Sequence, residues 1–254
     1  MTPASSNRAL GLEARSLDGV VTTPRRLILW DIDGTLLSAG PVGRTVFDRA
    51  VEEVLGRHPG EHGVSMGGKT DPQIALEILA ATGVLEGDRE ARLAAVLAAL
   101  ERHTGAAWDA MRMDGRIHPG VESLLARLHG HTDVAQSVLT GNLQPNARAK
   151  VAAFGLDHYL DLEIGAYGSD DQDRTKLVPV ALRRLRTVRG VQLRPDQTWI
   201  VGDTPRDLAC ARAGGSRCLL VATGHHPFEE LVSLNADEVL RDLSDEAAVV
   251  RILV

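Results

Sequence analysis

The stretch LILWDIDGTLL, residues 27–37, decides the fold of this chain. Its first four residues, Leu27 to Trp30, are all apolar, which is typical of a buried strand in a parallel sheet. Asp31 and Asp33 follow at once, and Gly34 then turns the chain away. Because ligands bind at the carboxyl ends of the strands in an open α/β sheet, both aspartates are expected at a ligand site.

The two aspartates need a partner for their charge. Two close carboxylates repel each other, so at least one must be protonated or paired with a cation. A divalent cation with oxygen ligands is the simplest partner, and Mg²⁺ fits best. The plainer interpretation of Asp31 to Thr35 is a solvated Asp-Gly turn at the end of a strand.

Three further segments carry polar residues where a strand ends or a helix begins. In VAQSVLTGN, residues 134–142, Thr140 and Asn142 flank Gly141. In TWIVGDTPRD, residues 198–207, Asp203 and Asp207 follow an apolar run. Between them, DDQDRTKL at residues 170–177 places the cations Arg174 and Lys176 at the start of a predicted helix. The chain order is therefore a carboxylate pair, a hydroxyl, a cation and a second carboxylate pair.

This constellation resembles the haloacid dehalogenase superfamily, and within it the subgroup of phosphoglycolate-phosphatase-like hydrolases with a helical cap. The resemblance covers about residues 25 to 225, essentially the whole globular part. It implies a phosphatase that acts on a small phosphorylated metabolite through an aspartyl-phosphate. It also implies that Asp31 is the nucleophile and Asp33 the general acid and base. The dehalogenase branch lacks an aspartate at the position of Asp33, so the resemblance argues against halide chemistry.

The resemblance assigns the remaining polar residues to the phosphoryl group. Thr140 would donate its hydroxyl to a phosphoryl oxygen, with backbone amides around Gly141 and Asn142 beside it. Either Arg174 or Lys176 would hold the nucleophile and phosphate together, and their spacing prevents both from pointing at the same place. We favour Arg174, which leaves Lys176 as a solvated surface charge. The alternative for Thr140 is a strand-end residue that satisfies a local turn.

The metal site is expected to hold Mg²⁺ between the two strand ends. Asp31 and Asp203 would be its carboxylate ligands, and the resemblance adds the backbone carbonyl of Asp33. Thr204 and Pro205 are typical of an N-cap and a first helical position. Asp207 then falls in the first helical turn, where it either only caps the helix or orients the cation or a metal-bound water.

The order of elements predicts an α/β fold with a doubly wound, Rossmann-like parallel sheet. Strands are predicted at 27–30, 134–139, 198–202 and 217–221, with a short strand near 161–164 and an edge strand at 239–240. Residues 41–115 read as helices only, which predicts an all-helical cap inserted into a core made of residues 25–40 and 116–254. Residues 1–24 are interpreted as a flexible tail.

A glycine-rich element of the predicted cap, GGKTD at residues 67–71, combines Lys69 with a helix N-terminus. Such an element can close over the site and contact an anionic substrate through Lys69. The equally weighted alternative is a surface loop with a solvated lysine.

Bulk composition limits the possible partners. The 254 residues carry 28 basic and 34 acidic side chains, a net charge of −6, which argues against nucleic acid as an electrostatic partner. No apolar run approaches a membrane span, and the first residues contain no apolar signal-peptide core, so we expect a cytoplasmic protein. Cys210 and Cys218 are expected to be reduced core residues. For the oligomeric state, the sequence is compatible with a monomer and with a homodimer.

Two other functions compete with the phosphatase. A phosphosugar mutase on the same scaffold would return the phosphoryl group from the aspartate to the substrate. A non-catalytic binding protein of the same fold predicts the loss of an acidic residue, yet Asp31, Asp33, Asp203 and Asp207 are all present. Phosphonate cleavage would require a Schiff-base lysine and another residue at position 33.

Overall fold

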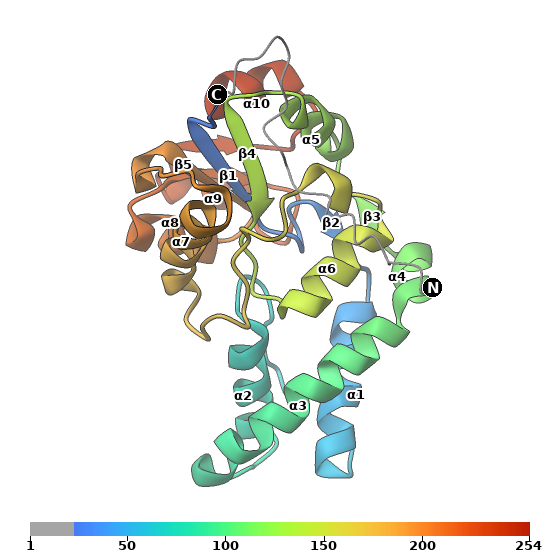
Figure 1. The fold of residues 1–254 in the computed structure, drawn as a ribbon. Coiled ribbons are helices and arrows are strands. Elements are labelled where there is room, and N and C mark those ends of the chain that lie inside the picture. Colours follow the sequence, from blue (N-terminus) through green and yellow to red (C-terminus); the bar gives the residue numbers. More distant parts are fainter. Residues whose placement is uncertain (1–22) are drawn as a thin grey trace, which may run out of the picture.

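The computed structural model describes residues 23–254, and its centre is a five-stranded parallel sheet in the order β4-β1-β5-β6-β7 (Figure 1). The strands are β1 (Arg26–Trp30), β4 (Val134–Val138), β5 (Thr198–Gly202), β6 (Arg217–Val221) and β7 (Glu238–Leu240). β1 is an interior strand and pairs with β4 on one side and with β5 on the other. Trp30 lies opposite Val201, so Asp31 emerges at the same level as the end of β5.

Helices cover both faces of the sheet, which explains the unbroken apolar run in β1. Ile28 and Trp30 pack on the face covered by α5 (Val121–His129), α6 (Gln144–Ala153) and α10 (Glu246–Leu253). Leu27 and Leu29 pack on the opposite face, under α7 (Leu177–Arg189), α8 (Pro205–Gly214) and α9 (Phe228–Ser233). The predicted doubly wound sheet is confirmed, because its strands are parallel and helices cover both of its faces. A strand buried on both faces has no solvated side, so all of its residues can be apolar.

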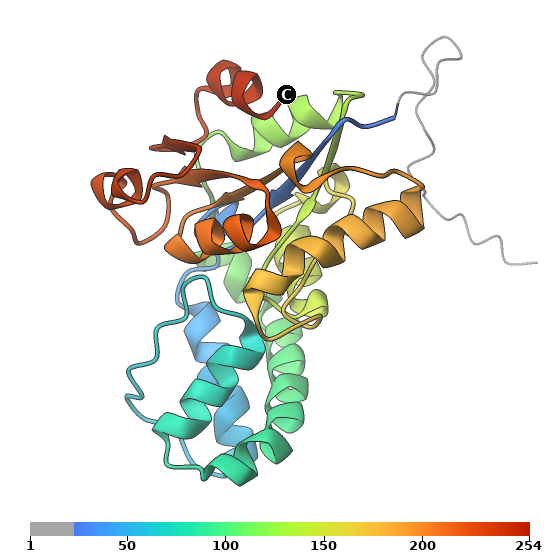
Figure 2. The ribbon, with the colours of Figure 1, turned by 90° about the vertical axis from the view of Figure 1, so that its left-hand side faces the viewer.

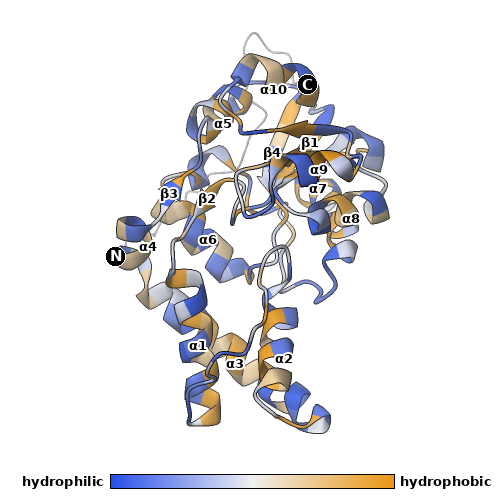
Figure 3. Cartoon of the chain, turned by 180° about the vertical axis from the view of Figure 1, so that it is seen from behind, coloured by the Kyte–Doolittle hydropathy of each residue, from blue (hydrophilic) through white to orange (hydrophobic). Residues whose placement is uncertain are grey.

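A group of helices stands beyond the carboxyl end of the sheet (Figures 1 and 2). It contains α1 (Val42–Leu55), α2 (Asp71–Ala81) and α3 (Glu86–Ala106), and the short α4 (Trp108–Asp114) leads back to the sheet. Figure 3 shows hydrophobic and hydrophilic residues mixed along α1 and α2, whereas β1 and β4 are mostly hydrophobic. Phe47, Ile78 and Leu100 are buried between these helices, which gives the cap an apolar interior.

The two chain segments that join the cap to the sheet are paired. β2 (Leu37–Ser38) runs antiparallel to β3 (Arg116–Ile117), so the exit from the core and the return to it form a small ribbon. The inserted helical cap agrees with the prediction. Its boundaries at residues 41 and 115 stay a prediction, and most of the predicted tail, residues 1–22, lies outside the described part of the chain.

The strand predicted near residues 161–164 is wrong. This segment follows a short 3₁₀-helix (Asp157–Tyr159) and forms no strand. It contacts the edge strand β4 through the Asp161 N–H, which donates to the Gln136 carbonyl at 2.8 Å, and through a bridge between Leu139 and Ala166. The Asp161 carboxylate accepts hydrogen bonds from the backbone N–H of Glu163 and from Arg189, a local arrangement that competes with strand pairing. In addition, the helix predicted from residue 174 begins as a 3₁₀ turn (Arg174–Lys176), and α7 starts at Leu177.

The remaining predicted elements lie close to their expected positions. β5 and β6 have the predicted bounds, and β7 is the expected edge strand. Cys210 and Cys218 are both free and buried. No helix among residues 23–254 is both long and apolar enough to cross a membrane.

Candidate active site

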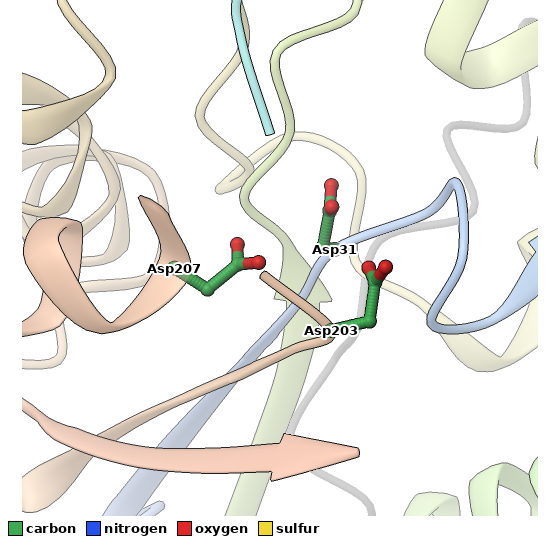
Figure 4. A group of neighbouring side chains, drawn as sticks. All are labelled: Asp31, Asp203 and Asp207. Atoms are coloured by element: carbon green, nitrogen blue, oxygen red, sulfur yellow. The ribbon is translucent and has the colours of Figure 1, made fainter. Parts of the chain in front are cut away.

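Three buried aspartates gather where β1 and β5 end (Figure 4). Asp31 follows β1, Asp203 follows β5 and Asp207 lies in the first turn of α8. The backbone N–H of Asp31 continues the sheet by donating to the carbonyl of Val201 at 2.8 Å. One carboxylate oxygen from each aspartate lies within 4.8 Å of the others, so the parallel register of β1 and β5 brings the predicted acidic residues together.

Gly34 allows Asp203 to approach the turn that follows β1. Its φ of 88° is in the left-handed region, and a Cβ there would lie 2.4 Å from Asp203 Oδ2. Thr35 Oγ1 donates to Asp203 Oδ1 at 3.1 Å, and Thr223 Oγ1 donates to the Gly34 carbonyl at 2.6 Å. Asp31 and Thr35 are buried, whereas the Asp33 side chain is 43% exposed, so the Asp-Gly turn packs against Asp203 and is only partly solvated.

The structure separates the two candidate cations. Arg174 is buried, with its guanidinium 3.2 Å from Asp31 Oδ1 and 2.5 Å from Asp207 Oδ1. The Lys176 side chain is 62% exposed and lies 3.4 Å from Asp171 Oδ2 at the surface. Arg174 thus reaches the acidic cluster, and the candidate role of Lys176 at this site is corrected: the 3₁₀ turn points it outward.

Asp207 supports the cluster from behind. One of its oxygens accepts from Arg174, and the other accepts from both the backbone N–H and the hydroxyl of Thr204. It therefore caps α8 and holds the guanidinium at the same time, which joins the two alternatives for this residue. Asp31 and Asp203 are the members of the cluster with fewer protein partners.

Burial and mutual repulsion dominate the electrostatics of this cluster. Burial raises the pKa of Asp31 to about 6, even though Arg174 acts in the opposite direction. Burial, followed by the charges of Asp207 and Asp31, raises the pKa of Asp203 to about 8. Burial alone would lower the pKa of Arg174, but Asp207 and Asp31 raise it above its ordinary value. Three carboxylates facing one guanidinium leave negative charge uncompensated, so the donor set fits a divalent cation with oxygen ligands.

The loop after β4 carries the predicted hydroxyl. Thr140 is fully buried, and its Oγ1 accepts from the Asn142 side-chain amide at 2.8 Å. The same amide nitrogen donates to Asp33 Oδ2 at 2.7 Å. Thr140, Asn142 and Asp33 are therefore one hydrogen-bonded group beside the acidic cluster.

The cap meets the core at Gly141. The backbone N–H of Asp71 donates to the Gly141 carbonyl at 2.7 Å, and a Cβ at Gly141 would lie 1.9 Å from the Lys69 carbonyl. The Lys69 ammonium pairs with Glu77 of α2, and its side chain is largely buried. Lys69 is therefore not a solvated surface lysine in this structure. Its ammonium is paired with Glu77 and does not contact the acidic cluster.

A cavity of about 550 Å³ lies between the cap and the sheet edge. The predicted residues Asp31, Asp33, Lys69, Thr140, Gly141, Asn142, Arg174 and Asp203 all line it. Apolar side chains of the cap, among them Phe47, Ile74 and Leu100, form its other wall. The arrangement can bind a small anionic molecule with one end at the carboxylates and the other against the cap.

The sequence-based prediction does not include Lys150, which also lines the cavity. Its ammonium donates to Asp33 Oδ2 at 2.6 Å and to Asn142 Oδ1 at 2.7 Å. A signal was present in the sequence, because Lys150 interrupts the buried face of α6 next to Ala147 and Val151. The partner of that buried charge lies 117 residues away and could not be read from the helix pattern.

Comparison with known proteins agrees with this architecture. The phosphoglycolate phosphatase of Nitrosospira multiformis is 26% identical over 231 residues, which cover 90% of this chain and 96% of that protein. The phosphoglycolate phosphatase of Rhodospirillum rubrum is 28% identical over 229 residues, covering 86% and 88%. The crystal structure of a predicted phosphoglycolate phosphatase from Haemophilus somnus 129pt has the same fold, with a TM-score of 0.66 and 20% identity over 89% of this chain and 97% of that one.

The sequence also matches a family described as haloacid dehalogenase-like hydrolase over residues 28–212. This region begins inside β1 and ends inside α8, so it spans the cap and every predicted site residue. The resemblance inferred from the four motifs is confirmed, and the chain belongs to the haloacid dehalogenase-like hydrolase family.

Proposed function

We propose that this protein is a Mg²⁺-dependent phosphatase that hydrolyses a small phosphomonoester through a phosphorylated Asp31. The observation that carries the proposal is the convergence of Asp31, Asp203 and Arg174 at one end of the cavity, with Asp33 beside them. The Asp31 carboxylate is buried beside the Arg174 guanidinium, whereas the Asp33 carboxylate, which lines the cavity, is 43% exposed. Two carboxyls in such different environments suit a nucleophile and an acid–base pair.

The Arg174 side chain gives independent support for a phosphoryl ligand. Its Nε is a buried donor that has no hydrogen-bond partner among residues 23–254. A buried donor without an acceptor is costly, and a phosphoryl oxygen at the cavity would supply one. Thr140 adds a second donor, because its oxygen already accepts from Asn142 and its own proton is left for another acceptor.

The reaction follows from these positions in two displacements. A carboxylate oxygen of Asp31 attacks phosphorus while the ester P–O bond breaks, and Asp33 gives its proton to the departing oxygen. Asp33 then takes a proton from water, whose oxygen attacks the aspartyl-phosphate. The P–O bond to Asp31 breaks, which returns the free carboxylate and releases inorganic phosphate. Arg174 and Thr140 stabilise the charge on the phosphoryl oxygens in both steps.

The cation would be held by the carboxylates of Asp31 and Asp203, with the backbone carbonyl of Asp33 as a third ligand by resemblance to the family. When bound, Mg²⁺ would neutralise phosphoryl charge and align the group for in-line attack. Asp207 would orient Arg174 and take no direct part, because both of its oxygens already accept hydrogen bonds.

The names of the relatives suggest where to begin with substrates. Both curated relatives above are phosphoglycolate phosphatases, so phosphoglycolate belongs first in a panel of small phosphomonoesters that also includes sugar phosphates. Sequence identities of 26% and 28% do not identify the metabolite. We expect the cap to select it, because cap residues form the far wall of the cavity.

The test is phosphate release across this panel, with Mg²⁺ and after treatment with EDTA. Asp31→Asn would be assayed beside Asp109→Asn, which removes an exposed carboxylate of the cap. We expect release that requires Mg²⁺, is lost in Asp31→Asn and persists in Asp109→Asn. Release that survives Asp31→Asn would refute the phosphorylated aspartate. Conversion of a sugar phosphate to its isomer without free phosphate would support the mutase instead.

A further inference from the structure

Lys150 is a buried cation on α6 that the proposed reaction does not use. Its side chain is 11% exposed, and it lies on a helix face whose neighbours Ala147 and Val151 are buried. Burying an ammonium costs free energy unless it is paired and hydrogen-bonded. A residue needed only for packing would be apolar at this position, so its hydrogen-bond partners are the place to look for its role.

The hydrogen bonds of Lys150 have only one possible direction. An ammonium can donate but cannot accept, so Asn142 Oδ1 must be the acceptor at 2.7 Å. This fixes the orientation of the Asn142 amide, and its nitrogen donates to Asp33 Oδ2 and to Thr140 Oγ1 at 2.7 and 2.8 Å. Thr140 Oγ1 therefore accepts from Asn142, and its own O–H, which has no acceptor among residues 23–254, can donate to a ligand in the cavity that Thr140 lines.

The same lysine also determines which oxygen of Asp33 is available. Lys150 and Asn142 both donate to Oδ2, at 2.6 and 2.7 Å, and Oδ1 has no hydrogen-bond partner among residues 23–254. Two donors on one oxygen restrict rotation of the carboxyl group, so the other oxygen is held toward the cavity that Asp33 lines. Without the ammonium, the Asn142 amide could turn and direct its oxygen at the carboxylate.

We propose that Lys150 is a positioning residue of this active site, which holds the acid–base carboxyl of Asp33 and the donor direction of Asn142 so that Asp33 Oδ1 and the Thr140 hydroxyl face the substrate. This inference rests on the proposed phosphatase function. It differs from a purely structural role, in which Lys150 would only neutralise nearby carboxylates such as Asp71 of the cap.

The two roles differ in what the loss of Lys150 changes. A misdirected Asp33 slows protonation of the leaving oxygen, which matters for an alkyl phosphate and little for p-nitrophenyl phosphate, whose leaving group is stable as an anion. We therefore expect Lys150→Met to slow the first turnover of the best alkyl substrate by about 100-fold, within the usual range for acid–base catalysis. The first turnover of p-nitrophenyl phosphate should slow by less than about 10-fold, because it does not need that proton.

The experiment is a rapid-quench measurement of the first turnover, together with kcat and KM, for wild type, Lys150→Met, Lys150→Arg and Arg148→Met. Arg148 is the matched control, since it is a cation of the same helix that pairs with Glu163 away from the cavity. We expect KM to stay nearly constant in Lys150→Met, Lys150→Arg to recover part of kcat, and Arg148→Met to match wild type.

Two results would overturn the positioning role while the phosphatase stands. One is a Lys150→Met protein as fast as wild type on the alkyl ester. The other is an equal loss on both esters with a raised KM and a lowered Tm, as a structural lysine predicts. A wild-type protein without phosphatase activity, or an Asp31→Asn protein that keeps it, would refute the proposed function and this inference with it.

Discussion

Asp71 of the cap provides a prediction whose size and sign follow from its environment. It is the first residue of α2, and its Oδ2 accepts from the backbone N–H of Leu143 at 2.7 Å, across the boundary between cap and core. Burial raises the pKa of its carboxyl to about 6, although Lys150 and the Leu143 N–H act in the opposite direction. The change to make is Asp71→Asn, which keeps the shape and an acceptor oxygen but cannot ionise.

The free energy follows from the shift of the pKa between the unfolded and folded states. A shift from 3.8 to about 6 corresponds to about 3 kcal/mol at 1.36 kcal/mol per pKa unit. Because the folded state keeps its proton longer than the unfolded state, this contribution is fully present below about pH 3.8 and is lost as pH rises through about 6. From about pH 4.5 to 7.5, wild type should therefore lose about 2 kcal/mol relative to Asp71→Asn.

The assay is urea unfolding of wild type, Asp71→Asn and Asp109→Asn at several pH values across this window. The quantity compared is the difference in the free energy of unfolding between each variant and wild type, so titrations shared by all three proteins cancel. Asp109→Asn removes an exposed carboxylate of the same cap and should show no such trend. We expect the free energy of unfolding of Asp71→Asn minus that of wild type to increase as pH rises. A value that stays constant with pH, or that decreases as pH rises, would refute a raised pKa at this position.

Other changes test the acidic cluster itself. Gly34→Ala should lower the free energy of unfolding by about 1–3 kcal/mol in urea, since φ is 88° and the Cβ would meet Asp203, whereas Gly43→Ala, with open space, should not. Arg174→Met should lower the free energy of unfolding by about 3–5 kcal/mol, because it leaves two buried carboxylates without their counter-charge. The free energy of unfolding of Lys176→Met should stay within about 0.5 kcal/mol of the wild-type value. In calorimetry, Mg²⁺ should raise the Tm of the wild type but not that of Asp203→Asn; equal shifts would contradict a metal site there.

The parts of the site that the sequence predicted are those fixed by local pattern. Asp31 and Asp203 each follow an apolar run at a strand end, and parallel pairing of β1 with β5 is enough to bring them together. The choice of cation depended on a single 3₁₀ turn (Arg174–Lys176), whose geometry decides which of two nearby side chains points inward. Residue type and spacing could narrow that choice but could not make it.

The missed residue and the wrong strand have a common physical cause. Lys150 reaches Asp33 across 117 residues, and Asp161 binds Arg189 across 28. In both places a long-range charged contact decides the local structure or role, and no periodicity in the sequence records which charges meet. Such contacts appear in sequence only as a violation of the local pattern, such as a lysine beside the apolar residues Ala147 and Val151 on the buried face of a helix.

The two aspartates of the first motif are only two residues apart, yet they face different cations. Asp31 is buried against Arg174, which Asp207 holds from behind, whereas Asp33 is partly exposed and bound by Lys150 and Asn142. β1 ends at Trp30, just before both aspartates, and the turn at Gly34, with its positive φ, follows Asp33. Because each carboxyl has its own cation, the chain need not rely on a shared proton to keep both at one sheet edge. This separation allows one carboxylate to remain a nucleophile while its near neighbour exchanges protons with the substrate.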